Sequence, residues 1–450
     1  MRPVTVAVLV FVAVAMVPTA RVFSSPSGSP AVLYTSAKRY DALAWVEGGE
    51  RFGAGATVYV ADGHGRHPLV PAFAASADPA VSFDARRVLF AGKRTASDPW
   101  QIWEVPLRGG NPKQITNCPA DCVRPLYLPE DRIVYAEKLN GRFIVQTAAL
   151  ADGHTLRLTY GTESAFPTDV LQDGRVLFES TTRVDGRAIP EIYTVYSDGS
   201  GVESYRCDHA QARHSGTQLR SGDIVFAEER GLARFTSSRA KEMPVSAPDG
   251  EYAGGIAESS AGEWFLPWRA NAKSFFQLMK WKSGQGTLLP AAQERGAHIL
   301  EPVLLTERRP PNRHPSALHD WPVGNLLCLN AYTSKYDFPA ASIRSVKVYT
   351  RSSAGAVQLL GVAPVEADGS FYVQVPGDQP LQIELLDATG KTLKREAGFF
   401  WLRHGEQRVC VGCHAGPETA PENAVPLILL KSTTPADMTH PTVQSSAGGH

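Results

Sequence analysis

The sequence predicts an all-β protein: a six-bladed β-propeller, with seven blades as the alternative, followed by a small β-sandwich-like domain that carries a C-x-x-C-H motif. Three observations predict this fold. A strand motif recurs at nearly constant spacing, strand-like segments with a different spacing follow it, and 39 Gly and 33 Pro supply frequent turns. Because 450 residues exceed one ordinary hydrophobic core, we expect more than one structural unit.

The recurring motif is a turn followed by a β-branched, an aliphatic and an aromatic residue. It occurs at Val88-Leu89-Phe90, Ile133-Val134-Tyr135, Val176-Leu177-Phe178 and Ile224-Val225-Phe226. The starts are 45, 43 and 48 residues apart, close to the length of one propeller blade. Leu43-Ala44-Trp45 extends the series upstream and Trp264-Phe265-Leu266 extends it downstream. Each repeat predicts a small antiparallel sheet that its neighbours cover, and the propeller is expected over residues 32–296.

The periodicity stops after the propeller. Residues 297–341 include the Pro-rich run 308–315 and are predicted to form an extended linker. Strand-like segments separated by Gly, Pro or Asp turns then predict a β-sandwich-like domain over residues 342–430. The Thr-, Ser-, Pro- and Gly-containing tail, residues 431–450, is expected to be disordered.

Residues 1–20 have the layout of a secretory signal peptide, with Arg2 ahead of an apolar run and Ala20 at the expected cleavage point. The apolar run from Val4 to Val17 has 14 residues, fewer than the roughly 20 needed to span a bilayer, which favours cleavage over a membrane anchor. We therefore expect a periplasmic or otherwise exported mature chain without an integral membrane span, in a compartment that permits disulfides and covalent haem attachment.

Charge gives no indication of a partner. Lys and Arg together number 45, and Asp and Glu together also number 45, so the chain has no excess of basic residues that would form a stripe for nucleic acid. Nucleic acid is therefore not an expected partner.

Cys410-Val411-Gly412-Cys413-His414 is the C-x-x-C-H pattern of c-type haem attachment. Two thiols at this spacing reach the two vinyl groups of one porphyrin, and the adjacent imidazole lies over the iron as its axial ligand. The alternatives are a small disulfide loop and half of a zinc site, but no second Cys pair follows to complete four zinc ligands. We expect one haem c, attached at Cys410 and Cys413, with His414 bound to the iron.

The distal iron ligand decides between electron transfer and chemistry at an open iron. The candidates are His314 and His319 in the predicted linker and Met438 in the tail. His314 and His319 are the more interesting, because a non-periodic segment between two domains can lie over a cofactor, whereas the tail that holds Met438 is expected to be solvated. A lone His is nevertheless more often structural or exposed than a ligand.

We expect structural roles for the four other cysteines. Cys118 and Cys122 lie in an inter-strand loop of the propeller and are expected to close a small disulfide. For Cys207 and Cys328, two interpretations stay open. Cys207 belongs to a metal site with His209 and His214, or it forms a bridge with Cys328 between propeller and linker.

The chain carries no Gly-x-Ser-x-Gly elbow, no His-Glu-x-x-His and no phosphate-binding Gly-rich loop. Whether it is an enzyme stays open at this point.

Two resemblances follow from these motifs. Segments 78–82 and 124–129, each ahead of a strand, resemble the TolB-type or WD40-like propeller repeats of exported proteins. Segments 361–371, 385–390 and 405–414, in that order, resemble the hydrazine synthase alpha-subunit family, and the resemblance covers most of the mature chain.

The second resemblance implies a propeller followed by a domain with c-type haem, in a family whose synthase joins nitric oxide and ammonium within a multi-haem complex. Only Cys410, Cys413 and His414 carry over by position. This chain has a single C-x-x-C-H motif, so the resemblance does not imply hydrazine synthesis.

Three hypotheses for function result. The favoured one is an exported c-type haem protein that exchanges electrons with a redox partner or multi-protein complex, with the propeller as docking platform. The second is a haem enzyme, related to the hydrazine synthase alpha subunit, that acts on a small nitrogen or oxygen species at an open iron. The third is a haem-independent propeller binding module. The fold alone does not select one of them, because propellers bind many kinds of ligand.

Overall fold

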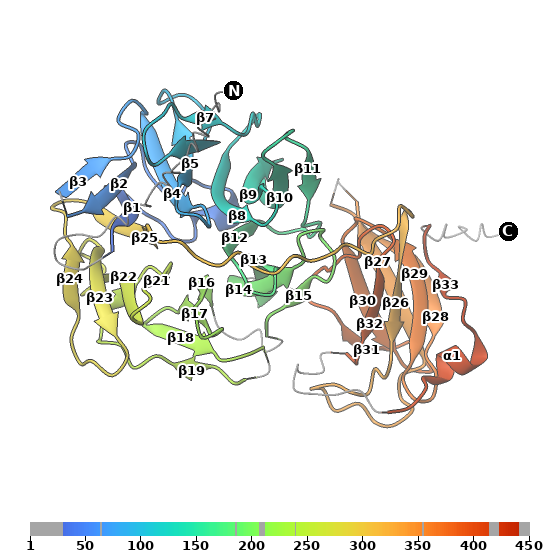
Figure 1. Cartoon of the computed structure of the whole chain (residues 1–450). Helices are drawn as coiled ribbons and strands as arrows, with labels where there is room; N and C mark the ends of the chain where they lie inside the picture. Colours follow the sequence, from blue (N-terminus) through green and yellow to red (C-terminus); the bar gives the residue numbers. More distant parts are fainter. Residues whose placement is uncertain are drawn as a thin grey trace, which may run out of the picture.

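The computed structural model describes residues 30–63, 65–184, 187–206, 212–238, 240–352, 355–413 and 423–440. It contains a propeller and a smaller β-sandwich side by side, joined by one long connection (Figure 1). The predicted signal peptide, residues 1–20, lies outside the described residues. Within the described part of the chain, no helix is long and apolar enough to cross a membrane.

The propeller has six blades, each a small antiparallel sheet. Blade 1 contains β25 (His298–Leu304), β1 (Val32–Ala37), β2 (Thr57–Asp62) and β3 (Gly65–Pro68). Blade 2 contains β4 (Ala75–Val81), β5 (Arg87–Lys93), β6 (Gln101–Pro106) and β7 (Lys113–Gln114). Blade 3 contains β8 (Cys122–Leu128), β9 (Arg132–Leu139), β10 (Arg142–Ala149) and β11 (Thr155–Arg157).

The remaining blades follow in chain order. Blade 4 contains β12 (Ala165–Val170), β13 (Val176–Val184), β14 (Arg187–Val195) and β15 (Glu203–Ser204). Blade 5 contains β16 (His214–Gln218), β17 (Ile224–Ala227), β18 (Leu232–Phe235) and β19 (Met243–Pro244). Blade 6 contains β20 (Glu251–Tyr252), β21 (Ala257–Glu258), β22 (Glu263–Arg269), β23 (Gln277–Lys282) and β24 (Leu289–Ala292).

The predicted triplets form the second strands of blades 2 to 6, where all their residues are buried. The upstream extension at Leu43-Ala44-Trp45 is wrong. A short 3-10 helix, η1 (Ala44–Glu47), lies there, and Trp45 stacks on Phe166 of blade 4 at 5.5 Å. The aromatic residue that suggested a strand is instead buried between blades.

The propeller closes through its last strand. Strand β25 pairs antiparallel with β1, so the C-terminal end of the propeller completes the sheet that the N-terminal end begins. The predicted linker 297–341 therefore needs correction, because it contains β25 and also β26 (Val323–Cys328), which belongs to the second domain. The connection proper, residues 305–322, runs across the propeller (Figure 1) and hydrogen-bonds to it through Arg308 and Asn312.

A cluster of buried charges lies where the innermost strands of blades 1 to 3 meet. Asp78, Arg124 and Glu301 each occupy a β-bulge with positive φ, at 56°, 55° and 52°. Arg51, from the loop before β2, forms ion pairs with Asp78 and Glu301, and Arg124 pairs with Glu301 at 2.6 Å. Buried carboxylates of this kind are tolerated because each has a guanidinium partner. The cluster ties the closing strand to its neighbours.

Glu179 of β13 is buried beside this cluster and accepts a hydrogen bond from the Ser215 backbone N–H. Burial raises the pKa of Glu179 to about 7, although that hydrogen bond and the Arg124 charge oppose the shift. The folded state therefore favours the protonated carboxyl, and ionisation makes folding less favourable.

We predict that the free energy of unfolding falls as pH rises from about 4.5 through 7, because Glu179 ionises more readily in the unfolded chain. Glu179→Gln should remove on the order of 3 kcal/mol of this pH dependence. Urea unfolding midpoints measured across the pH range test this, with Glu47→Gln, an exposed site, as control. An unchanged pH slope in Glu179→Gln would contradict the assignment.

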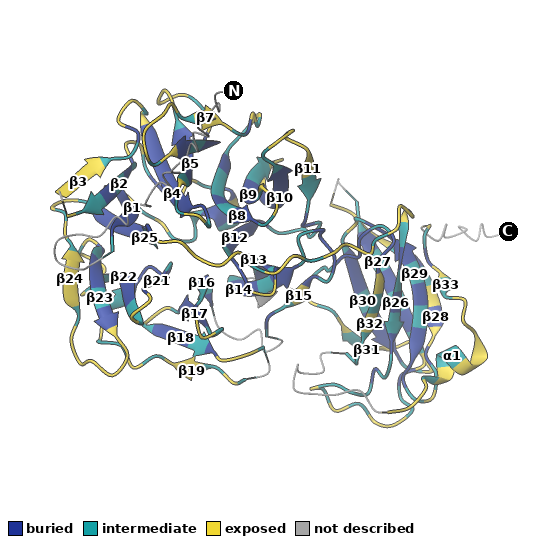
Figure 2. Ribbon diagram, in the orientation of Figure 1, coloured by how far each residue is buried: buried dark blue, intermediate teal, exposed yellow. Residues whose placement is uncertain are grey.

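The second domain is a β-sandwich of two four-stranded sheets. One contains β32 (Gln407–Cys410), β26, β29 (Phe371–Pro376) and β33 (Ala436–Asp437) in that order. The other contains β28 (Val357–Pro364), β27 (Ser345–Arg351), β30 (Leu381–Leu386) and β31 (Thr392–Arg395). Apolar residues from both sheets form one core between them, whereas the short helix α1 (Leu427–Lys431) buries no residue (Figure 2).

The domain is longer than the predicted range 342–430, because β26 precedes that range and β33 follows it. The predicted disordered tail 431–450 is wrong for residues 432–440. Strand β33 pairs in parallel with β29, and Met438 is buried against Gly361, where a Cβ would have no room. Residues 441–450 lie outside the described residues.

Trp401 fixes the sandwich to the propeller. Its indole is buried in the core between blades 3 and 4, 6.4 Å from the Tyr160 ring, and its N–H donates to the Gly199 carbonyl at 3.4 Å. Arg403 donates to the Arg157 carbonyl at 2.7 Å. These contacts hold the segment just before β32 against the propeller.

We predict that Trp401→Ala destabilises the chain by about 3–5 kcal/mol, the typical cost of removing a buried Trp. Loss of this contact should also separate domain unfolding into two transitions in differential scanning calorimetry. Trp321→Ala is the control, since Trp321 is 54% exposed. A single transition shifted no further than in Trp321→Ala would contradict the proposed role of Trp401.

Candidate functional site

The Cys pair lies at the end of an edge strand of the sandwich. Cys410 is the last residue of β32, and Cys413 lies in the bend that follows. Strand β32 pairs in parallel with β26, in register from Asn325–Gln407 to Cys328–Cys410. The Cys410 carbonyl then accepts a hydrogen bond from the Leu329 N–H at 2.9 Å. The pairing of the two strands thus fixes the position of the Cys pair at the sheet edge.

The bend itself is held by close backbone packing at Gly412. A Cβ at this position would lie 2.0 Å from the Thr333 carbonyl oxygen and 2.7 Å from that of Asn330. The Asn330 N–H also donates to the Val411 carbonyl at 3.2 Å. Only glycine allows this approach, so the second spacer residue of the motif fixes how the two thiols are presented.

Both thiols are half-buried and pack against the sandwich core, together with partly buried aromatic residues. Burial raises the pKa of Cys410, and it raises the pKa of Cys413 to about 12. Burial also raises the pKa of Cys328, with a further contribution from Cys413 and Cys410. Three protonated thiols therefore share one neighbourhood. Tyr332, Phe338, Leu393 and Phe400 are partly buried against the same core.

These residues fit a covalently attached haem. The motif needs two thiols on one turn, and the structure provides them with partial exposure at the border of an apolar core, surroundings that suit a porphyrin. Cys410 and Cys413 would hold the group through thioethers. The predicted axial ligand His414 lies outside the described residues.

The structure places the three predicted distal ligands away from this turn. His314 stacks on Tyr196 of the propeller at 3.9 Å. His319 stacks on Trp321, and its backbone contacts Gly405, five residues before Cys410. Met438 follows β33, at the opposite edge of the four-stranded sheet from β32, about 14 Å across.

The other sequence-predicted cysteines are placed as follows. Cys118 and Cys122 form the predicted disulfide, with Cα atoms 6.3 Å apart. Cys207 and His209 lie outside the described residues. His214 is half-buried in blade 5, and desolvation lowers its pKa to about 4, which keeps the ring neutral at neutral pH. Cys328 does not lie in a linker, because it is the last residue of β26.

Sequence reasoning missed that Cys328 is the neighbour of Cys410. The signal was present in Val323–Cys328, whose residues alternate between partly exposed and buried as a half-buried strand requires. Its position inside a segment predicted as linker concealed it.

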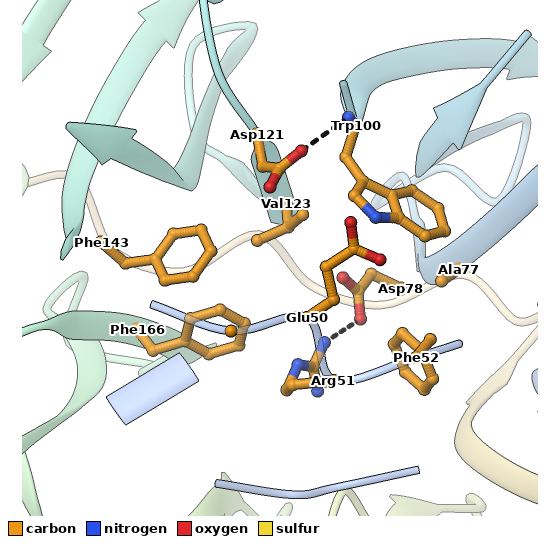
Figure 3. Close-up of a pocket in the computed structure, with 11 residues that line it drawn as sticks. Glu50, Arg51, Phe52, Ala77, Asp78, Trp100, Asp121, Val123, Phe143 and Phe166 are labelled. Atoms are coloured by element: carbon orange, nitrogen blue, oxygen red, sulfur yellow. Dashed lines mark hydrogen bonds and ion pairs between the residues drawn. The ribbon is translucent and has the colours of Figure 1, made fainter. Parts of the chain in front are cut away.

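The propeller offers a second place with buried polar groups. A cavity of about 20 Å³ lies beside the charge cluster, enclosed by aromatic side chains (Figure 3). Figure 3 shows the Arg51 guanidinium facing Asp78, with Phe52 and Phe166 close by. A space of this size holds about one water molecule, so it is no substrate pocket.

Comparison with known proteins shows which family model and which solved structures the chain is similar to. Residues 334–415 match the family model of the hydrazine synthase alpha subunit middle domain. Hydrazine synthase from Kuenenia stuttgartiensis superposes with a TM-score of 0.78 and 15% identity, over 89% of this chain and 71% of that chain. TolB from Acinetobacter baumannii superposes with a TM-score of 0.43 and 17% identity, over 61% of this chain and 66% of that chain. No curated protein matches the chain.

The fold and the site define a six-bladed β-propeller protein whose C-terminal β-sandwich presents a Cys pair on a sheet edge. Residues 334–415 are similar to the hydrazine synthase alpha subunit middle domain, which confirms for this segment the resemblance predicted from the C-terminal motifs. At 15% identity, the structural likeness to the Kuenenia stuttgartiensis enzyme shows the shared fold alone.

Proposed function

We propose that this chain is an exported c-type haem protein that exchanges electrons with a redox partner or within a multi-protein complex. The observation that carries the proposal is the turn 410–413. It presents two thiols at haem-attachment spacing, half-buried, on a sheet edge where both pack against the apolar core of the sandwich. In this proposal Cys410 and Cys413 bind one haem and His414 supplies the axial ligand. When bound, the haem supplies a one-electron redox centre.

The surroundings of the turn support exchange with a partner. Val409, next to Cys410, is 59% exposed, so the attachment point borders solvent and is accessible to a docking surface. Trp401 and Arg403 hold the segment just before this strand against blades 4 and 3, which keeps the redox centre in a fixed position relative to the propeller. The propeller can therefore act as the docking platform that orients a partner toward the haem edge.

We predict that the chain, exported together with cytochrome maturation machinery, gives a pyridine haemochrome spectrum with a c-type α band. Replacing both Cys410 and Cys413 by Ser should abolish it, because no thioether can form. Cys328→Ser is the matched control and should retain the band. A wild-type chain without covalent haem would rule out the proposal and leave a haem-independent propeller binding module.

A specific observation also favours a second function, a haem enzyme acting on a small nitrogen or oxygen species. His314, His319 and Met438 all contact other parts of the structure, which supports an iron without a ligand from these three residues. The same chain would then bind its substrate at the open position.

This second function predicts that the reduced haem protein binds carbon monoxide, seen as a shift of its Soret band. His314→Ala, His319→Ala and Met438→Leu should leave that shift unchanged, since none of these residues would occupy the iron. A reduced protein whose spectrum does not respond to carbon monoxide would exclude the enzyme function and leave electron transfer.

A further inference from the structure

Cys328 and Cys410 face one another across two hydrogen-bonded strands. They are the last of four successive partners in the parallel pairing of β26 with β32. Neighbouring strands lie about 4.8 Å apart, and partners in a parallel pair project their side chains from the same face of the sheet. Disulfides join Cα atoms separated by about 4.4–6.8 Å, so this register satisfies the main geometric requirement for a bond.

The side chains of both residues lie on the core side of the sheet. Cys328 is buried, 3% exposed, in the cluster formed by the two sheets. Cys410 packs against that same cluster, whereas the preceding residue, Val409, points to solvent with 59% of its surface exposed. The alternation along β32 therefore brings the Cys410 sulfur toward the face that holds Cys328.

The third thiol, Cys413, packs against the same cluster, so a bond between Cys410 and Cys413 is the competing arrangement. That bond requires the turn between them to close on itself. Gly412 lies wedged against the Thr333 and Asn330 carbonyls, which restricts such a rearrangement. The pairing across the strands needs no change in backbone register.

We propose that Cys328 is a third redox-active thiol of this site and forms a disulfide with Cys410 in the chain without haem. Oxidation removes two electrons and two protons from the two thiols and forms one S–S bond. A protein disulfide of the thiol–disulfide exchange class accepts these electrons and protons and becomes a dithiol. A dithiol reductant reverses the step and returns both thiols.

The disulfide would control haem attachment, a consequence that rests on the proposed function. A sulfur bonded to Cys328 cannot form a thioether, so Cys410 must be reduced before the haem is attached. Cys328 would then protect the Cys pair in an oxidising compartment until a reductant arrives.

The test is non-reducing peptide mapping of the full chain, exported to an oxidising compartment without maturation machinery and alkylated before digestion. Trypsin releases Cys328 in residues 314–335 and the Cys pair in residues 409–431. We expect these two peptides linked in the wild-type chain and in Cys413→Ser, and the yield of the link reduced at least tenfold in Cys410→Ser.

Two results would overturn the proposal. One is an alkylated Cys328 together with a disulfide inside the peptide 409–431, and the other is Cys328 linked to the peptide that contains Cys207. Because the experiment uses the chain without haem, its outcome is independent of the haemochrome measurement. Failure of one test therefore leaves the other conclusion standing.

Discussion

The pairing of β25 with β1 is the constraint on which the rest of the structure depends. A blade cannot bury its apolar faces alone, and this pairing joins the two ends of the ring of six sheets so that the first blade is completed by the last propeller strand. This pairing also brings Glu301 to Arg51 and Arg124, which joins the closing strand to the loop before β2 and to blade 3. The chain then leaves the closed ring at residue 305. The connection to the sandwich domain begins at this point.

The connection from this exit to the Cys pair is held at each stage. Residues 305–322 hydrogen-bond across the propeller, and Trp401 and Arg403 hold the segment just before β32 against blades 4 and 3. Strand β32 then pairs with β26, and its last residue is Cys410. A motif of five residues thus acquires a fixed location because two domains and a strand pair position it.

Local features of the fold could be predicted from the sequence. The triplets at 88–90 and 176–178 identified blade strands because each buries three consecutive residues next to a turn. The strands that were missed are β25, β26 and β33, whose partners lie far away in the chain. Periodicity carries no information about such pairings. Trp45 shows the opposite error, since a buried aromatic residue resembled a strand signal while lying on a 3-10 helix.

For the candidate site too, the local motif could be predicted from the sequence and its long-range neighbours could not. The C-x-x-C-H motif could be predicted because its chemistry depends on spacing within five residues. The neighbourhood of the motif could not, since Cys328 is 82 positions away from Cys410 and becomes its partner only through the parallel register. Met438 seemed free to reach an iron, whereas the pairing of β33 with β29 buries it in the sandwich core.

The central claim is that Cys410 and Cys413 carry a covalent haem, and the intact mass of the exported chain under denaturing conditions tests it most directly. We predict a mass that exceeds that of the processed polypeptide by one haem group, with the increase retained after acid–acetone extraction. A mass equal to that of the polypeptide alone, from cells that load a known c-type cytochrome in the same experiment, would contradict the account.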